Sequence, residues 1–158
     1  FKHGVANKQI RLHFVAHSAG SIVHAHIIDA LADRVKFESV NFLAPAVRRD
    51  TFDKLVLPRL QDGTIKRYQQ FHLTDKAEED DPTCAPYRRS LLYLVSESFE
   101  GGKSTPILGM DKYFDRALEK AKNVKVHVSP CADSTSTTHG GFDNDLPTQK
   151  QVVKFIKQ

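Results

Sequence analysis

The chain has 158 residues, of which 40% are hydrophobic and 27% charged, and its formal net charge is +4 at pH 7. This is the composition of an ordinary globular domain with one core. No run of 18 apolar residues is present, which excludes a transmembrane helix. Lys and Arg are interleaved with Asp and Glu along the chain, which speaks against nucleic-acid binding.

The expected elements begin with a strand that runs directly into a helix. The apolar run Leu12 to Ala16 meets Ser18, and a helical pattern follows from about Ala19 to Asp33 with no loop between. The helix carries a mainly apolar stripe, which predicts that it lies deep against a sheet. Its members are Val23, Ile27, Ala30 and Leu31, widened by Ile22 and Ile28.

Strand and helix patterns then alternate to the end of the chain. In order they are a strand over 39–43, a helix over 48–60, a strand over 65–73, a polar loop over 74–87, a helix over 90–99, a helix over 111–122, a strand over 124–128, a small-residue loop over 129–144 and a helix over 146–157. This alternation predicts an α/β fold, a three-layer α/β/α arrangement with a mainly parallel sheet. No linker divides the chain, so residues 1–158 are expected to form a single domain.

The loops that follow the strands are expected to meet. Ligands of parallel sheets bind at the carboxyl ends of the strands. Ser18, the polar segment 74–81 and the loop 129–144 all lie at such ends. A serine, a set of carboxylates and His139 are therefore expected in one place.

Two cysteines, Cys84 and Cys131, are too few for a disulfide framework or a zinc site. Both fall in loops expected at the same end of the sheet, so a single disulfide between them is an open alternative. Two reduced thiols are favoured, and a cytoplasmic location with them.

Ser18 lies at the apex of the sharp turn between the first strand and its helix. Such a turn forces its apex residue into a strained backbone conformation, and the small residues Ala16 and Gly20 let strand and helix approach. The serine hydroxyl is thereby exposed. The amide of Ala19 then lies at a helix N-terminus, where unpaired N–H groups favour negative charge.

The segment Ala16-His17-Ser18-Ala19-Gly20 resembles the nucleophile elbow of the α/β-hydrolase superfamily, with Ala16 in place of the first glycine. The chain order serine, acid, histidine is also that of the superfamily. The resemblance implies that Ser18 is the nucleophile, Asp75 the acid and His139 the base. It also implies that the Ala19 amide belongs to the oxyanion hole and that His17 lines the pocket.

The acid of this triad remains open between neighbouring carboxylates. Asp75 follows the third strand by two residues, where a side chain is held rigidly, and Asp80 and Asp81 are the alternatives. His139 is favoured as base because Gly140 and Gly141 free the backbone around it. No metal or cofactor is expected.

The resemblance implies a serine hydrolase, an esterase or lipase-like enzyme that cleaves a small-molecule ester through an acyl-enzyme. The alternative is a catalytically weak binding or assembly module. The superfamily's sheet typically has eight strands, and this chain matches the last four, so it is expected to be the C-terminal part of a longer protein without the second oxyanion donor. Its first strand would then be an exposed apolar edge, which predicts either a homo-oligomer through that edge or a missing segment that completes the sheet.

Overall fold

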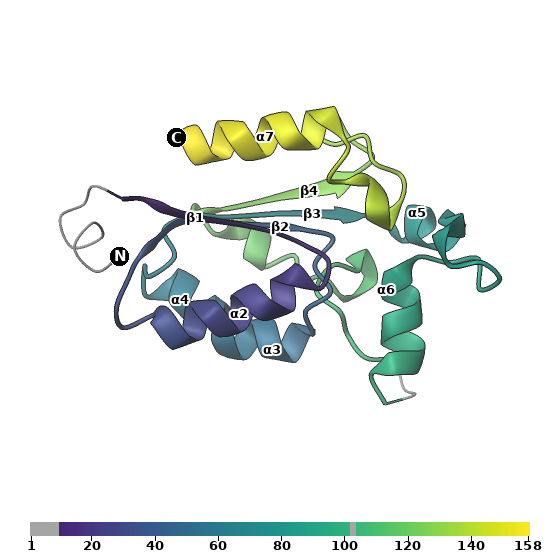
Figure 1. Ribbon diagram of the computed structural model, residues 1–158, viewed down its shortest axis with the longest axis horizontal. Coiled ribbons are helices and arrows are strands. Elements are labelled where there is room, and N and C mark those ends of the chain that lie inside the picture. The colour runs from purple at the N-terminus through teal and green to yellow at the C-terminus, as the bar shows by residue number, and fades with distance from the viewer. Residues whose placement is uncertain (1–9, 102–103) are drawn as a thin grey trace.

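The structure is a computed structural model that describes residues 10–101 and 104–158. Four strands form one parallel sheet in the order β1-β2-β3-β4. Figure 1 shows the helices α2, α3 and α4 on one face of the sheet and α7 on the other. The predicted α/β fold with a parallel sheet is confirmed. The strands are Leu12–His17, Phe37–Leu43, Tyr68–Leu73 and Val124–Ser129, and these helices are Gly20–Leu31, Arg49–Leu55, Leu57–Gln61 and Leu146–Lys157.

The centre of the sheet is buried on both faces. All six residues of β3 are buried, although half of them are polar. Tyr68 packs edge-on against Phe42 at 5.6 Å between ring centroids. Its hydroxyl donates to Gln70 Oε1 at 2.6 Å, and Gln70 Nε2 donates to the carbonyl of Leu108 at 3.2 Å. These partners satisfy Tyr68 and Gln70, whereas the buried Oε1 of Gln69 has no hydrogen-bond partner among the described residues.

The helix α2 buries a different stripe from the one that the sequence predicts. Its buried residues are Ser21, Ala25 and Ile28, whereas Val23 is 58% exposed and Ile27 36%. Ser21 explains the rotation, because its hydroxyl donates to the carbonyl of Ser18 at 2.7 Å and accepts from the amide of Val47 at 3.0 Å. Of the predicted stripe only Ile28 is fully buried, because this polar anchor turns the other members away from the core, so the predicted stripe was mostly wrong.

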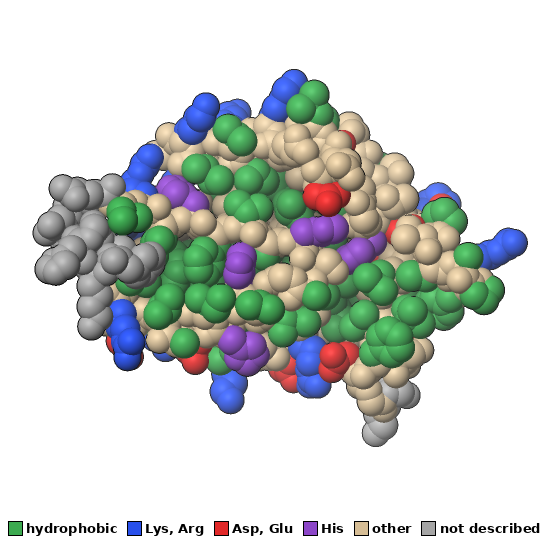
Figure 2. Space-filling view, viewed as in Figure 1, with side chains coloured by type: hydrophobic (Ala, Val, Ile, Leu, Met, Phe, Trp, Pro, Cys, Tyr) green, Lys and Arg blue, Asp and Glu red, His purple; other side chains and the backbone are tan. Residues whose placement is uncertain are grey.

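The strand β1 is an edge of the sheet, with β2 as its one neighbour among the described residues. Val15 of β1 is 42% exposed, and the apolar residues Val23 and Ile27 of α2 are also exposed, at 58% and 36%. Figure 2 shows hydrophobic side chains gathered across this view between α2 and α7. Association of the edge with a second copy stays a prediction.

The segment after β3 was predicted as a loop, and this was wrong. It forms the helix α5, Asp75–Asp80, followed by a short 3-10 turn, Pro82–Cys84. Thr74 caps α5, because its hydroxyl accepts from the amide of Ala77 at 3.2 Å. The cap and the carboxylate of Asp75 in the first turn stabilise a helix that the polar composition concealed.

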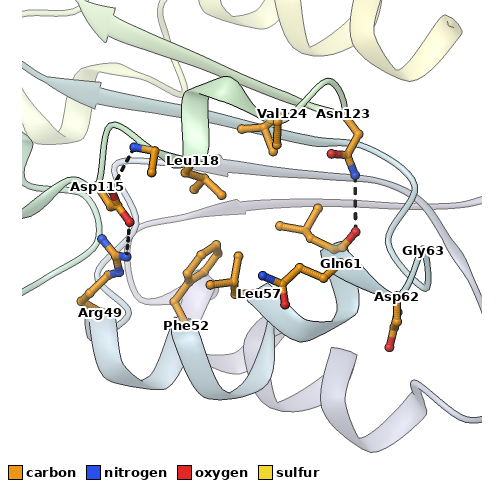
Figure 3. A pocket seen from close by; sticks show the side chains of 13 residues that line it. Arg49, Phe52, Leu57, Gln61, Asp62, Gly63, Asp115, Leu118, Asn123 and Val124 are labelled. Carbon is orange, nitrogen blue, oxygen red and sulfur yellow. Dashed lines mark hydrogen bonds and ion pairs between the residues drawn. The ribbon is translucent and has the colours of Figure 1, made fainter.

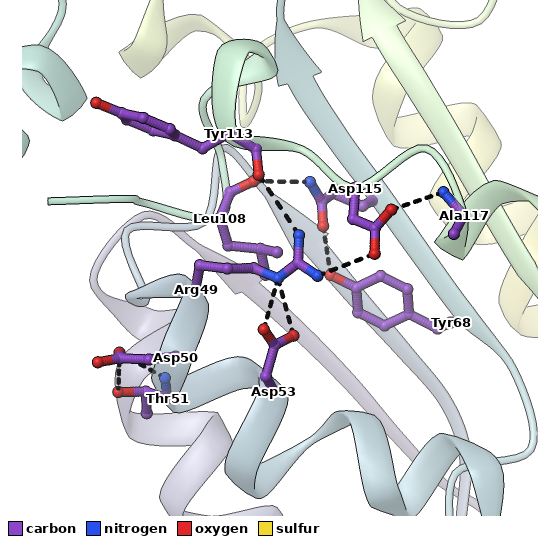
Figure 4. A network of polar contacts seen from close by, with 10 residues as sticks. Arg49, Asp50, Thr51, Asp53, Tyr68, Leu108, Tyr113, Asp115 and Ala117 are labelled. Atoms are coloured by element: carbon purple, nitrogen blue, oxygen red, sulfur yellow. Dashed lines mark hydrogen bonds and ion pairs between the residues drawn. The ribbon is translucent and has the colours of Figure 1, made fainter.

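The helix predicted over residues 111–122 does not form, and two 3-10 turns, Asp111–Tyr113 and Leu118–Lys120, stand in its place. Arg49 of α3 donates to the carbonyl of Tyr113 at 3.4 Å and to Asp115 at 3.2 Å (Figure 4). Asp115 in turn accepts from the amide of Ala117 at 2.8 Å. Side chains thus take backbone groups that a helix would pair internally.

The remaining elements follow the predicted order with shifted ends. The helix expected over 48–60 is divided into α3 and α4, and Pro58, which has no amide hydrogen, lies in the first turn of the second. The helix expected over 90–99 is present as α6, Leu91–Leu94, and a π-helical turn, Val95–Phe99. Within 10–101 and 104–158, no helix is long and apolar enough to span a bilayer.

Gly109 gives a test of how closely the segment before β4 packs. A Cβ atom there would lie 2.6 Å from the Pro45 carbonyl oxygen and 2.8 Å from its nitrogen. We expect Gly109→Ala to lower the free energy of unfolding by about 1–3 kcal/mol, because backbone atoms must move apart. Urea denaturation followed by circular dichroism measures this.

Gly140→Ala is the matched control, because a Cβ at Gly140 meets nothing within 4 Å. Equal denaturation midpoints for the two variants would contradict the close packing at Gly109.

Candidate active site

The turn at Ser18 has the strained backbone that the sequence predicts. Ser18 follows the last residue of β1 and has φ of 52°, a left-handed conformation that non-glycine residues rarely adopt. Its amide donates to the carbonyl of Leu43 at 2.9 Å, and its carbonyl accepts from the amide of Ala46 at 3.1 Å. The ends of β1 and β2 therefore hold the serine in place.

Small residues flank this turn, as expected. Ala16 is buried, and a Cβ added to Gly20 would lie 3.5 Å from the Ala16 Cβ, in ordinary van der Waals contact, so strand and helix approach closely here. Ala19 precedes α2, and its amide donates to no acceptor within the described part of the chain. This free N–H at a helix start is suited to a developing negative charge.

Ser18 and His139 lie in contact. The distance from Ser18 Oγ to His139 Nε2 is 2.8 Å, within hydrogen-bond range. His139 is 3% exposed and begins a 3-10 turn, His139–Gly141. Phe142, fully buried in a cluster with Leu73 and Val152, anchors that turn to the sheet and to α7.

Buried hydroxyls fix the loop that carries His139. Ser129 Oγ at the end of β4 donates to the carbonyl of Ser136 at 2.6 Å. The carboxylate of Asp145 accepts from the amides of Thr135 and Thr148, each at 3.0 Å, and so caps α7 while it holds the loop. These residues were not singled out from the sequence, where the loop reads as small and polar.

The two glycines after His139 do not adopt the backbone conformations that only glycine readily reaches. Neither Gly140 nor Gly141 has a positive φ. A Cβ on Gly141 would lie 2.5 Å from Ser136 Oγ and 2.9 Å from Thr138 Oγ1. Gly141 therefore provides space for these two side chains.

The carboxylate beside His139 belongs to Asp81. Its Oδ2 accepts from the His139 amide at 2.7 Å, and its Oδ1 accepts from the amide of Thr83 at 2.9 Å. Asp75 lies elsewhere: its Oδ1 accepts from the amide of Lys112 at 3.3 Å. Asp80 forms a surface ion pair with Lys76 at 3.0 Å.

The helix α5 explains why the last acidic residue, rather than the first, reaches His139. About 1.7 helical turns separate Asp75 from Asp81, so the two side chains leave the segment in different directions, and that of Asp81 meets the loop after β4. The sequence did carry a signal, because an aspartate before Pro82 with a donor two residues on is typical of an Asx turn. Asp81 is 1% exposed, which places its carboxylate inside the protein.

Burial lowers the pKa of His139 to about 4. Loss of solvation for the charged ring is the largest cause, the charge of His17 lowers the pKa further, and Asp81 raises it. The imidazole is therefore neutral at pH 7. In the tautomer whose Nε2 accepts from Ser18, the proton of the neutral ring is on Nδ1, which is buried and has no hydrogen-bond partner.

The ring of His17 lies against that of His139. The ring centroids are 5.4 Å apart and the planes are inclined by 30°. His17 Nε2 is also 2.9 Å from the carbonyl oxygen of His139.

A cavity of about 630 Å³ lies away from these residues (Figure 3). Val124, the first residue of β4, and Gly63, which precedes β3, line it, so it is at the opposite end of the strands from Ser18. Arg49 also lines the cavity, and its guanidinium is paired with Asp53 and Asp115. Among the residues described, no group of three His, Cys, Asp or Glu side chains is arranged to hold a metal ion.

Comparison of the chain with protein-family models, with curated proteins and with solved structures finds no match.

The pKa of His139 gives a prediction for solution. The imidazole C–H resonances should shift with a midpoint near pH 4 instead of near 6.5, because the folded protein favours the neutral ring. Proton NMR over pH 3–8 measures the midpoint, and the spectrum of His139→Ala identifies the resonance. A midpoint near 6.5 would contradict the buried, desolvated position.

Proposed function

We propose that the protein is a serine hydrolase that cleaves an ester through an acyl-enzyme. One observation carries the proposal, the 2.8 Å contact between Ser18 Oγ and His139 Nε2. A serine hydroxyl is a weak nucleophile, and a neutral imidazole within hydrogen-bond reach is the base that activates it. The strained turn and the free Ala19 amide complete a nucleophile with one oxyanion donor.

The reaction follows from these groups. As Ser18 Oγ attacks the ester carbonyl carbon, its proton passes to His139 Nε2, and the negative carbonyl oxygen faces the Ala19 amide. The protonated His139 then gives its proton to the departing alcohol, leaving Ser18 acylated. Water attacks the acyl group by the same steps in reverse order, which releases the acid and restores both side chains.

We propose Asp81, rather than Asp75, as the acid of this site. Its carboxylate already bonds to the amide of His139, the residue whose Nδ1 lacks a partner. An Nδ1–H to Asp81 bond would orient the ring and stabilise the imidazolium formed during attack. Loops after the first, third and fourth strands supply Ser18, Asp81 and His139, an order that supports an α/β-hydrolase-like fold.

A second candidate is a binding or assembly module with a weakly active serine. The exposed edge of β1, with Val15 open to solvent, favours it, because an unpaired edge strand is a template for another strand. A second copy of this chain is the occupant that such an edge fits most simply, since one strand pairs with its copy about a twofold axis.

Both cysteine thiols are free, which agrees with a reducing compartment such as the cytoplasm.

The proposed hydrolase is tested with a fluorophosphonate probe, which reacts covalently with activated serines. We expect the parent chain to be labelled and Ser18→Ala and His139→Ala to lose labelling, because one removes the nucleophile and the other its base. Labelling is measured by the increase in intact mass. An unlabelled parent, folded by circular dichroism, would favour the assembly module over the hydrolase.

The acid is tested by Asp81→Asn beside Asp75→Asn. We expect the first to slow labelling on the order of 10³-fold or more, as loss of the orienting carboxylate does in such triads. Asp75→Asn should label at the parent rate, since Asp75 bonds to the Lys112 amide instead. The reverse ranking, in variants with equal melting temperatures, would return the role to Asp75.

A further inference from the structure

His17 makes a contact that lining a pocket does not require. Its Nε2 lies 2.9 Å from the carbonyl oxygen of His139, although 122 residues separate the two in the sequence. A carbonyl oxygen only accepts hydrogen bonds, so Nε2 of His17 carries the proton. The geometry therefore assigns one tautomer to the neutral ring, with Nδ1 unprotonated.

Three groups hold His139 at three different points. Asp81 accepts from its amide at 2.7 Å, His17 donates to its carbonyl at 2.9 Å, and Ser18 Oγ contacts its Nε2 at 2.8 Å. The rings of His17 and His139 also stack, with centroids 5.4 Å apart. Because His17 and Ser18 are consecutive, the residue that holds the base is covalently joined to the nucleophile.

We propose that His17 is a positioning residue, whose Nε2–H bond to the His139 carbonyl sets the distance between the base and Ser18. This inference rests on the proposed hydrolase function. A displacement of about 1 Å between reacting groups can cost on the order of 10²-fold in rate. A donor at the end of β1 limits such displacement, because His17 is followed directly by Ser18, whose amide is bonded to the carbonyl of Leu43.

Other contacts separate this role from simple support of the fold. Phe142 is fully buried in the sheet–α7 cluster, and Asp81 holds the amide of His139, so the loop stays anchored without His17. The groups facing His139 that carry or acquire charge are His17 and Asp81. Removal of the His17 donor should therefore alter the alignment of the base while the loop remains folded.

The test compares His17→Gln with His17→Phe, and uses His26→Phe as control because His26 is exposed on α2. The amide nitrogen of glutamine reaches about as far as Nε2 of histidine and keeps the donor, whereas phenylalanine keeps only the ring. We expect His17→Phe to lower the fluorophosphonate labelling rate about 10- to 100-fold. His17→Gln should recover most of the parent rate, and His26→Phe should equal the parent.

A merely structural role would give a different result. If His17→Phe labels at the parent rate, or if glutamine and phenylalanine lower the rate equally, the hydrogen bond is not the cause and the inference is overturned. Melting temperatures within about 2 °C of the parent would show that the variants remain folded. With a p-nitrophenyl ester as substrate, a lower kcat at unchanged KM supports positioning, since substrate binding would be unchanged.

Failure of the two proposals can be told apart. A parent that does not label overturns the hydrolase proposal and the His17 role with it, whereas a labelled parent with an unaffected His17→Phe overturns only the latter. Nitrogen-15 NMR of the His17 ring adds a readout independent of activity. The Nε2–H tautomer is expected at pH 8, and the Nδ1–H tautomer would overturn the inference.

Discussion

The hydrogen bonds around Ser18 join the parts of the molecule on which the site depends. The Ser18 amide is bonded to the end of β2, and its carbonyl receives both the amide of Ala46 and the side chain of Ser21. These partners stabilise a positive φ that would cost free energy in an unrestrained chain. They also set the rotation of α2, because Ser21 faces the turn. One junction thus determines the direction of the serine, the start of the helix and the course of the chain after β2.

The sequence predicts the features that depend on local pattern and strand order. The alternation of strands and helices gave the parallel sheet, and parallel strands bring their carboxyl ends together, so Ser18 and His139 were expected in one place and lie 2.8 Å apart. The predicted buried side of α2 was mostly wrong because both sides of this helix carry apolar residues. Only the bond from Ser21 to Val47, which crosses between elements, decides which side is buried.

Asp81 shows a second limit of reading a sequence by position. Asp75 is nearer to the strand, and proximity to a strand end is a reasonable guide when the following segment is a loop. Here Thr74 starts a helix, and the helix carries the chain far enough that Asp81, not Asp75, reaches His139. The missing helix over 111–122 has a similar origin. Its amphipathic pattern is real, but Arg49 and Asp115 take the backbone groups that a helix would use.

The contact between Ser18 and His139 spans 121 residues of sequence. Nearly every strand crossing and helix packing must be in place before the two atoms meet, because β1 and the loop after β4 lie at opposite ends of the sheet order. Closing so long a segment is entropically unfavourable until the intervening elements have packed. The contact between Ser18 and His139 therefore forms only when the chain is completely folded. A partly folded chain would retain helices and strands yet leave the serine without its base.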